Sequence, residues 1–172
     1  MMGKFLAVLL LGSAVIAGAS MYYLQVYGLY DEVKTSEVQL VSVVDDLPGS
    51  ISFDNFQAID SLSSPIRYRA CFTTDLSISL LSETYVGLEK ASPRNAPKWV
   101  NCFDAVAIGA ELMAGTAVPF LGQKNVHFGV DRIVAITNDG RGYIWHDLND
   151  CGDKAYDGTI VGEECPGREA TE

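Results

Sequence analysis

The sequence contains few of the residues from which catalytic and metal sites are usually built. It has two histidines, His127 and His146, and four cysteines, with no C-x-x-C pair. A histidine-based zinc site, a Ser/His/Asp triad and a Cys/His pair would each lack a component. His146 lies between Ile144 and Leu148, so we expect a buried core histidine whose ring does not meet His127. This scarcity favours a protein that is not an enzyme and that holds no metal and no cofactor.

Nucleotide-binding signatures and positive charge are also lacking. Neither G-x-x-x-x-G-K-[ST] nor G-x-G-x-x-G occurs. The chain has 12 Lys+Arg against 22 Asp+Glu; only Lys4 precedes Asp31, and every acidic residue follows Tyr30, which leaves 11 basic and 22 acidic residues after that point. This acidity opposes binding to nucleic acid and adhesion to anionic lipid.

The segment after Asp147 begins like a calcium-binding loop but departs from that pattern. Cys151 stands where the fifth position takes Asp or Asn, and Gly158 stands where the twelfth takes Glu. A looser calcium site would use the carboxylates of Asp147, Asp150, Asp153 and Asp157. We interpret the segment as a solvated acidic loop.

Charged residues are absent from the longest apolar run, Phe5–Leu24. A helix of this length spans about 30 Å, the thickness of a bilayer's hydrocarbon core, and it satisfies its own backbone hydrogen bonds, as a membrane requires. Lys4 is the only charged side chain before the run, which favours a cytoplasmic N-terminus and an exported remainder. Tyrosines typical of the boundary between lipid and water follow it: Tyr22, Tyr23, Tyr27 and Tyr30.

A cleaved secretory signal is the alternative interpretation of this run. Ala17-Gly18-Ala19 resembles a signal cleavage site, but the apolar run continues past it into tyrosine-rich sequence, which favours a retained anchor. The helix also carries small residues at a four-residue spacing, which would let a second membrane helix approach closely: Ser13 with Ala17, and Ala14 with Gly18.

All four cysteines lie in the exported part, where an even number predicts two disulfides with three connectivities. We favour the pairing of sequence neighbours, Cys71 with Cys102 and Cys151 with Cys165. The second bridge would stabilise the fold by about 3 kcal/mol on a loop-entropy estimate.

The organisation that follows is a single-pass membrane protein with one domain. Its predicted parts are a cytoplasmic N-terminus (1–4), a transmembrane anchor (5–27), a polar neck (28–36), a periplasmic domain (37–165) and a flexible acidic tail (166–172). The predicted class is α+β, with a mostly antiparallel sheet and one main packed helix.

Alternation and turn signals place the strands. Strands are predicted at Glu37–Val44 and Ile66–Thr73, and a hairpin is predicted to join Val126–Thr137 to Tyr143–Leu148 through a turn centred on Gly140. In that hairpin His146 is expected to face Val134. The segments 51–59 and 75–85 cannot be assigned from pattern, and 89–98, with two prolines, is predicted to be a surface loop.

The main helix is predicted to begin at an Asn101 cap and to end at Gly115. Its core face is predicted from residues that recur at helical spacing: Phe103, Val106, Ala107, Ala110 and Met113.

Two groups of side chains are candidates for contact with a ligand or partner. Arg67 and Arg69 are expected on one face of a strand, where they would either grip a carboxylate or phosphate or pair with nearby acidic side chains. Tyr143 and Trp145, with Trp99, would form an aromatic contact patch or close a small core.

Four stretches together resemble a family of small alphaproteobacterial membrane proteins that carry a single helix and a periplasmic domain of unknown function: MYYLQVYGLYDEV, SSPIRYRACF, CFDA and HFGVDRIVAITNDGRGYIWH. The resemblance covers most of the chain. It implies the localisation and the architecture, but no activity. The label histidine kinase, sometimes given to such proteins, has no support here, because the sequence lacks a dimerisation helix pair with a phosphoacceptor and the glycine boxes that bind ATP.

From the sequence we therefore predict an accessory or assembly subunit of a complex in the bacterial inner membrane. Its membrane contact would be Phe5–Leu24, and its partner would be an inner-membrane protein. The alternative is a periplasmic module that senses a small anion through Arg67 and Arg69.

Overall fold

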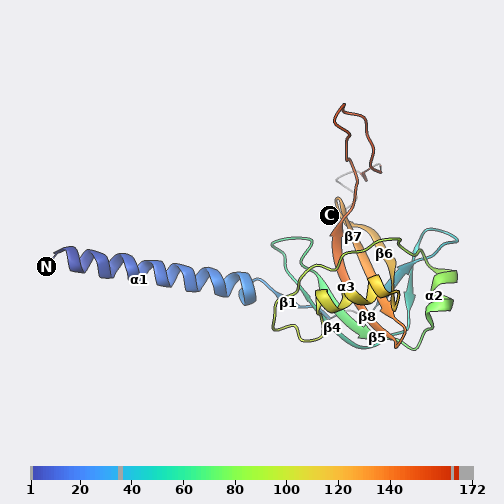
Figure 1. Cartoon of the computed structure of the whole chain (residues 1–172), viewed down its shortest axis with the longest axis horizontal. Coiled ribbons are helices and arrows are strands. Elements are labelled where there is room, and N and C mark those ends of the chain that lie inside the picture. Colours follow the sequence, from blue (N-terminus) through green and yellow to red (C-terminus); the bar gives the residue numbers. More distant parts are fainter. Residues whose placement is uncertain (1, 35–36, 164, 167–172) are drawn as a thin grey trace.

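The computed structural model describes residues 2–34, 37–163 and 165–166. A long N-terminal helix leads into a domain built of one large sheet with helices on it (Figure 1). The helices are α1 (Met2–Tyr23), its π-helical continuation η1 (Leu24–Gly28), α2 (Ile78–Thr84) and α3 (Ala105–Ala114). The strands are β1 (Asp31–Glu32), β2 (Val38–Val41), β3 (Pro48–Ile51), β4 (Asp54–Asp60), β5 (Arg69–Thr73), β6 (Ala117–His127), β7 (Val130–Thr137) and β8 (Arg141–Leu148).

The N-terminal helix stands apart from the domain, and none of its residues is buried. Among the described residues, Met2–Gly28 is the one helix long and apolar enough to cross a membrane, with a mean hydropathy of 2.0. Length and composition of this kind fit a membrane anchor or a signal sequence. The predicted helix is confirmed. It extends through a π-helical turn to Gly28, and the chain then forms β1 at the edge of the sheet.

The sheet has six strands in the order β1-β4-β5-β8-β7-β6, and every neighbouring pair is antiparallel. β2 and β3 form a separate two-stranded hairpin. The predicted α+β class is therefore confirmed, and so is the hairpin of β7 and β8 around Gly140, which has a φ of +82° that suits glycine.

Each face of the sheet is covered by a core of its own, because successive side chains of a strand point to opposite faces. On one face, Phe72, Val134 and Ile144 pack with residues of the β2–β3 hairpin and α2. On the other face, Trp145 packs with Phe103 and with Ile108 of α3. The sheet is thus the middle layer of the domain.

Both favoured disulfides are present. Cys71 of β5 is bonded to Cys102, which precedes α3, and their Cα atoms are 6.2 Å apart. Cys151 is bonded to Cys165, with a Cα separation of 4.9 Å. The first bridge therefore fastens the segment that leads into α3 to the centre of the sheet. Apart from residue 166, the predicted acidic tail lies outside the described residues, as do residues 35–36 of the predicted neck.

The predicted strands have different bounds in the structure. The strand expected at Glu37–Val44 is limited to Val38–Val41, and the one expected at Tyr143–Leu148 begins at Arg141. The strand expected at Ile66–Thr73 begins only at Arg69, because residues 64–67 form a turn in which the Arg67 N–H donates to the Ser64 carbonyl. The strand expected at Val126–Thr137 is interrupted by a turn at Gly129, which has a φ of +72°. Its first part belongs to β6, a strand the pattern did not reveal.

The predicted helix is present but shifted, and its predicted core face is wrong except at Phe103, which is buried. The N-cap is Asp104, not Asn101, since its carboxylate accepts from the N–H groups of Val106 and Ala107. Ile108 is the buried residue of α3. Val106 and Met113, assigned to the core from their spacing, are 79% and 86% exposed.

Candidate functional site

The C-terminal end of the apolar helix Met2–Gly28 contacts the domain through aromatic side chains. The indole Nε1 of Trp99 donates a 2.7 Å hydrogen bond to the Val26 carbonyl. The Trp99 ring stacks on Tyr27 with centroids 6.1 Å apart and meets Tyr30 edge-on at 6.0 Å. These contacts cross from the segment before α3 to the last turns of the helix, so they hold the helix and the domain in one arrangement.

Arg67 belongs to this junction. Its guanidinium lies 5.5 Å from the centre of the Tyr30 ring, and its Nη1 donates to the Ser63 hydroxyl at 3.2 Å. A cation over an aromatic face is attracted to the ring's negative centre. Arg67 therefore extends the contact between the anchor and the domain to the turn before β5.

Arg69 is buried, and the fold uses its donors. It is 5% exposed, and its guanidinium donates to four backbone carbonyls, those of Ile66, Tyr68, Arg94 and Asn95. Burial lowers its pKa to about 10. The two carbonyls of residues 94 and 95 belong to the predicted surface loop, so Arg69 holds that loop against the sheet. The structure does not bring Arg67 and Arg69 together as a two-pronged anion site.

Tyr143 and Trp145 are core residues, so the predicted contact patch is wrong for this pair. They are 7% and 0% exposed, and each meets the Phe103 ring edge-on. The alternative, that tryptophan closes the core, is confirmed for Trp145. Trp99, the third member of the expected patch, lies at the anchor instead.

His146 is a core histidine, as expected, but its neighbours differ from those predicted. It is 2% exposed and stacks on Tyr68 at 4.7 Å. Its Nδ1 bonds the Pro65 carbonyl at 2.7 Å, and its Nε2 accepts from Arg132 Nε at 3.1 Å. Burial lowers its pKa to about 4, so the ring is neutral at physiological pH.

Two expectations about His146 are wrong. Its partner across β7 is Arg132, not Val134. The His127 ring lies 6.1 Å from it, because the turn at Gly129 folds the end of β6 back alongside β7. Within the described residues, no group of three or more His, Cys, Asp or Glu side chains is placed to hold a metal ion.

The outer face of α3 is apolar and exposed. The helix packs on the sheet through Ile108, with Ala105 and Leu112 partly buried beside it. The opposite side carries the five apolar residues that we define as the α3 outer face: Val106, Ala107, Ala110, Met113 and Ala114. Apart from Glu111, which pairs with Arg141, α3 is apolar on the side facing the sheet and on the opposite side. A helix apolar on opposite sides is typical of one that is covered on both. This face therefore has the character of an interaction surface.

A second exposed apolar group lies on the loop that the Cys151–Cys165 disulfide closes. We call residues 151–165 the C-terminal loop. Tyr156 is 107% exposed, and Ile160 and Val161 are 65% and 63% exposed. In Figure 1 the loop extends from the domain sideways, across the direction of α1.

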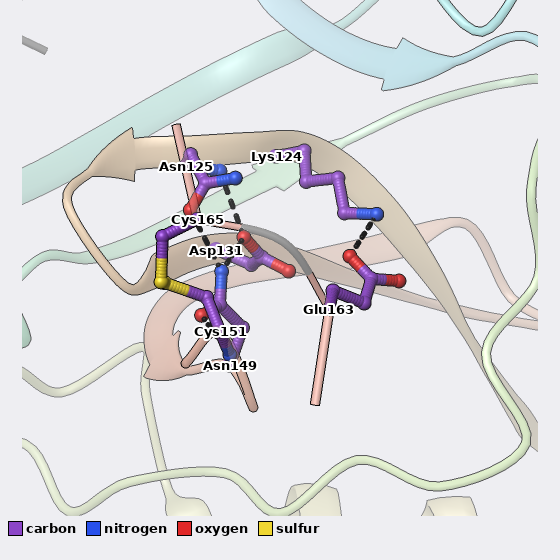
Figure 2. Close-up of a disulfide and its surroundings, with 7 residues drawn as sticks. All are labelled: Lys124, Asn125, Asp131, Asn149, Cys151, Glu163 and Cys165. Atoms are coloured by element: carbon purple, nitrogen blue, oxygen red, sulfur yellow. Dashed lines mark hydrogen bonds and ion pairs between the residues drawn. A yellow bond between two sulfur atoms is a disulfide. The ribbon is translucent and has the colours of Figure 1, made fainter. Parts of the chain in front are cut away.

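The base of the C-terminal loop is fixed to the sheet by polar contacts (Figure 2). Asp131 Oδ1 accepts from the Asn125 N–H at 2.7 Å and from the Asn149 amide at 2.8 Å. Asn149 Oδ1 in turn accepts from the Cys151 N–H at 3.1 Å. Lys124 forms an ion pair with Glu163, which raises the lysine pKa.

The small residues of the anchor remain a predicted packing face. Ser13, Ala14, Ala17 and Gly18 are all exposed, and the Ser13 hydroxyl donates to the Leu10 carbonyl within the helix. Nothing in the domain covers them.

A model described as a family of unknown function (DUF6446) matches residues 38–166. No curated protein matches the chain, and no solved structure matches it. The match covers most of the chain and begins after the anchor.

Proposed function

The chain belongs to DUF6446, a family of unknown function, and from this premise we propose that it is an accessory or assembly subunit of an inner-membrane complex. In this proposal α1 is a retained anchor with a cytoplasmic N-terminus. The domain lies in the periplasm, where its two disulfides form, and it binds a membrane protein partner without catalysing a reaction.

The α3 outer face carries this proposal. Val106 and Met113 together expose large apolar side chains at helical spacing, and the alanines between them would let a partner approach the backbone. The fold does not need these side chains, since Ile108 packs α3 on the sheet. Exposed apolar patches of this kind mark protein interaction sites.

The junction at Trp99 supports the same proposal. It fastens the domain to the end of the anchor, so the α3 outer face keeps one orientation relative to the bilayer. Partners in the same membrane share that frame, and a preset orientation reduces the entropy lost on binding. The anchor would add its own contact through the small residues around Ala14 and Ala17.

The chemistry of the polar core supports a non-enzymatic role. His146 and Arg69 are the groups whose pKa values burial lowers most clearly, and both bond main-chain carbonyls of the fold. The alternative proposal, an anion-sensing module, would need both Arg67 and Arg69. Because Arg69 is occupied by four carbonyls, only Arg67 would face a ligand, and no observation favours this alternative.

Purification of the tagged full-length chain from its native membrane in mild detergent tests the proposal. We expect a specific membrane protein to co-purify with the wild type, and its yield to fall about tenfold with Val106→Asp/Met113→Asp, because the charges would be buried at the interface. Leu62→Asp is the matched control, since Leu62 is 101% exposed elsewhere on the domain. Recovery of the chain alone, or an equal loss with the control, would contradict the proposal.

A further inference from the structure

The C-terminal loop is a preformed structure and not a loose strand. Residues 154 and 160 form a β-bridge, and the Ala155 N–H donates to the Thr159 carbonyl at 2.8 Å. The turn between them is closed by the Gly158 N–H, which donates to the Ala155 carbonyl at 2.9 Å, and by Asp157 Oδ1, which accepts from the Thr159 N–H at 3.0 Å. Hydrogen bonding from Thr159 lowers the pKa of Asp157.

The two ends of the loop are held together closely. The disulfide joins Cys151 to Cys165, and the Gly152 N–H donates to the Glu163 carbonyl at 3.1 Å. Gly162 passes so close to the Asp150 carbonyl that a Cβ at this position would overlap it. With the network around Asp131 below it, the loop is fixed at its base and braced along its length.

The Tyr156 side chain, at the tip of the loop, takes no part in the hydrogen bonds that hold the loop. Tyr156 lies in the turn and is 107% exposed, so its ring contacts neither the domain nor the rest of the loop. Ile160 and Val161 lie on the segment that returns from the turn, and each leaves more than half of its surface in water. An aromatic ring on a preformed loop loses little conformational entropy when it binds, and buried tyrosines are frequent hot spots of protein interfaces.

The charges around the tip indicate what it fits. Between the two cysteines, the described residues carry three carboxylates and one lysine: Asp153, Asp157 and Glu163, with Lys154. Glu163 is paired with Lys124 at the base of the loop, so Asp153 and Asp157 are the carboxylates nearest to Tyr156 in the chain that have no ion pair among the described residues. An exposed apolar tip flanked in the chain by Asp153 and Asp157 is complementary to an apolar pocket whose rim carries basic groups. The same carboxylates oppose insertion of Tyr156 into an anionic membrane surface.

The direction of the loop indicates where the partner lies. It extends sideways from the domain, neither along α1 toward the membrane nor away from it (Figure 1). A protein whose extracytoplasmic part stands beside this domain is placed to meet the tip.

We infer that the C-terminal loop is a recognition element that inserts Tyr156 into an apolar, basic-rimmed pocket on the extracytoplasmic part of a neighbouring membrane protein. The inference rests on the proposed function and adds the element that recognises the partner, the C-terminal loop. It is distinct from the α3 outer face, which lies on another part of the domain.

Photo-crosslinking of the full-length protein in its native membrane tests the inference. Ile160 is replaced by p-benzoylphenylalanine, and the adduct is digested and mapped by mass spectrometry. We expect one adduct, on an extracytoplasmic segment of another membrane protein that combines apolar residues with Lys or Arg. Adding Tyr156→Ala should lower its yield about tenfold or more, as truncation of a hot spot does. Adding Asp153→Asn should weaken the adduct and reduce its sensitivity to salt.

The controls separate this inference from the proposed function. Leu62→Ala, at a residue that is 101% exposed elsewhere, should change the yield less than twofold. An adduct between two copies of the chain, an adduct with lipid, or a yield that Tyr156→Ala leaves unchanged would overturn the inference. The same photoreactive residue placed at Met113 tests the α3 outer face. An adduct from position 113 but none from position 160 would overturn the inference and leave the proposed function standing. No adduct from either position would overturn both the inference and the proposed function.

Discussion

The Trp99 indole donates its hydrogen bond to the carbonyl of Val26, 73 residues earlier in the chain and inside the last turns of the apolar helix. That carbonyl can accept the bond because the helix ends at Gly28, and the last carbonyls of a helix have no partner within it. This hydrogen bond and the stacking of Trp99 on Tyr27 fix the orientation of the N-terminal helix relative to the domain. A displacement of the helix by a membrane partner would therefore move the domain with it.

Removing the Trp99 side chain should loosen the junction without unfolding the domain. Trp99 is 37% exposed and lies outside both core clusters, so we expect Trp99→Ala to leave the domain folded. Loss of the hydrogen bond and the ring contacts should weaken the junction by about 2 kcal/mol. Trypsin cleavage after Lys34 should then become up to about thirtyfold faster, the factor that corresponds to about 2 kcal/mol. Trp99→Phe retains an aromatic ring, so its cleavage rate should lie between those of the wild type and Trp99→Ala. An unchanged cleavage rate in Trp99→Ala would show that these contacts do not stabilise the junction.

Adding a single methyl group at Gly142 should strongly destabilise the domain. Gly142 pairs with Phe72 across β5 and β8, and a Cβ at 142 would overlap the Phe72 ring. We expect Gly142→Ala to lower the free energy of unfolding by about 1–3 kcal/mol, as overpacking of a core does. Urea titration measures this change.

Gly109 offers the matched control. It lies within α3, and its nearest neighbour would be the Pro93 ring carbon at 4.0 Å from a new Cβ. Gly109→Ala should therefore stabilise the protein by roughly 0.5–1 kcal/mol through helix propensity. Similar effects of the two substitutions would contradict the close packing of Gly142 on Phe72.

Stability should fall with pH between about 6.5 and 4 because of His146. Its pKa in the folded domain is lowered to about 4, chiefly by burial, whereas an unfolded histidine titrates near 6.5. In this window the unfolded chain binds more protons, so the contribution of His146 is complete above pH 6.5 and is lost as the pH approaches 4. The loss should be on the order of 3 kcal/mol.

Urea unfolding at pH 7.5 and at pH 4.5 measures this dependence. His146→Gln should be less stable at neutral pH but should show a smaller decline on acidification. Asp139, whose pKa is lowered to about 2 by Arg141 and Thr137, titrates below this window. Equal declines in wild type and variant would assign the pH dependence to other groups.

Removal of the Cys71–Cys102 bridge should cost stability across the whole domain. The bridge closes a sequence separation of 31 residues and ends within the central sheet. On the loop-entropy estimate, Cys71→Ser/Cys102→Ser should lower the free energy of unfolding by about 4 kcal/mol. The emission of the buried Trp145 follows the transition. A loss below about 1 kcal/mol would mean that the segment before α3 is held by other contacts.

Local signals predicted much of this fold correctly. Asn138-Asp139-Gly140 marked the hairpin of β7 and β8, Gly115 marked the end of α3, and pairing of sequence neighbours identified both disulfides. Each of these features depends on residues close together in the chain. The apolar, charge-free run Phe5–Leu24 likewise predicted the N-terminal helix from composition alone.

The errors concern features that depend on distant segments. Because α3 is apolar on both sides, periodicity could not decide whether Ile108 or Met113 faces the sheet. For Arg69 the sequence left two alternatives, a ligand or nearby acidic side chains, and neither is what it bonds, because two of its carbonyl partners lie in a loop 25 and 26 residues later. Tyr156 was overlooked because one tyrosine in an acidic loop forms no pattern, although a tyrosine between two cysteines of a small closed loop was a usable signal.

The central claim is that α1 holds a disulfide-bonded domain outside the cytoplasm. Acid trapping of thiols in intact native cells, followed by alkylation with a polyethylene glycol maleimide without prior reduction, tests it most directly. The account predicts that the chain is found in the membrane fraction at full length and takes up no reagent at Cys71, Cys102, Cys151 or Cys165. Uptake of four reagent molecules per chain would show a reduced domain and contradict the account.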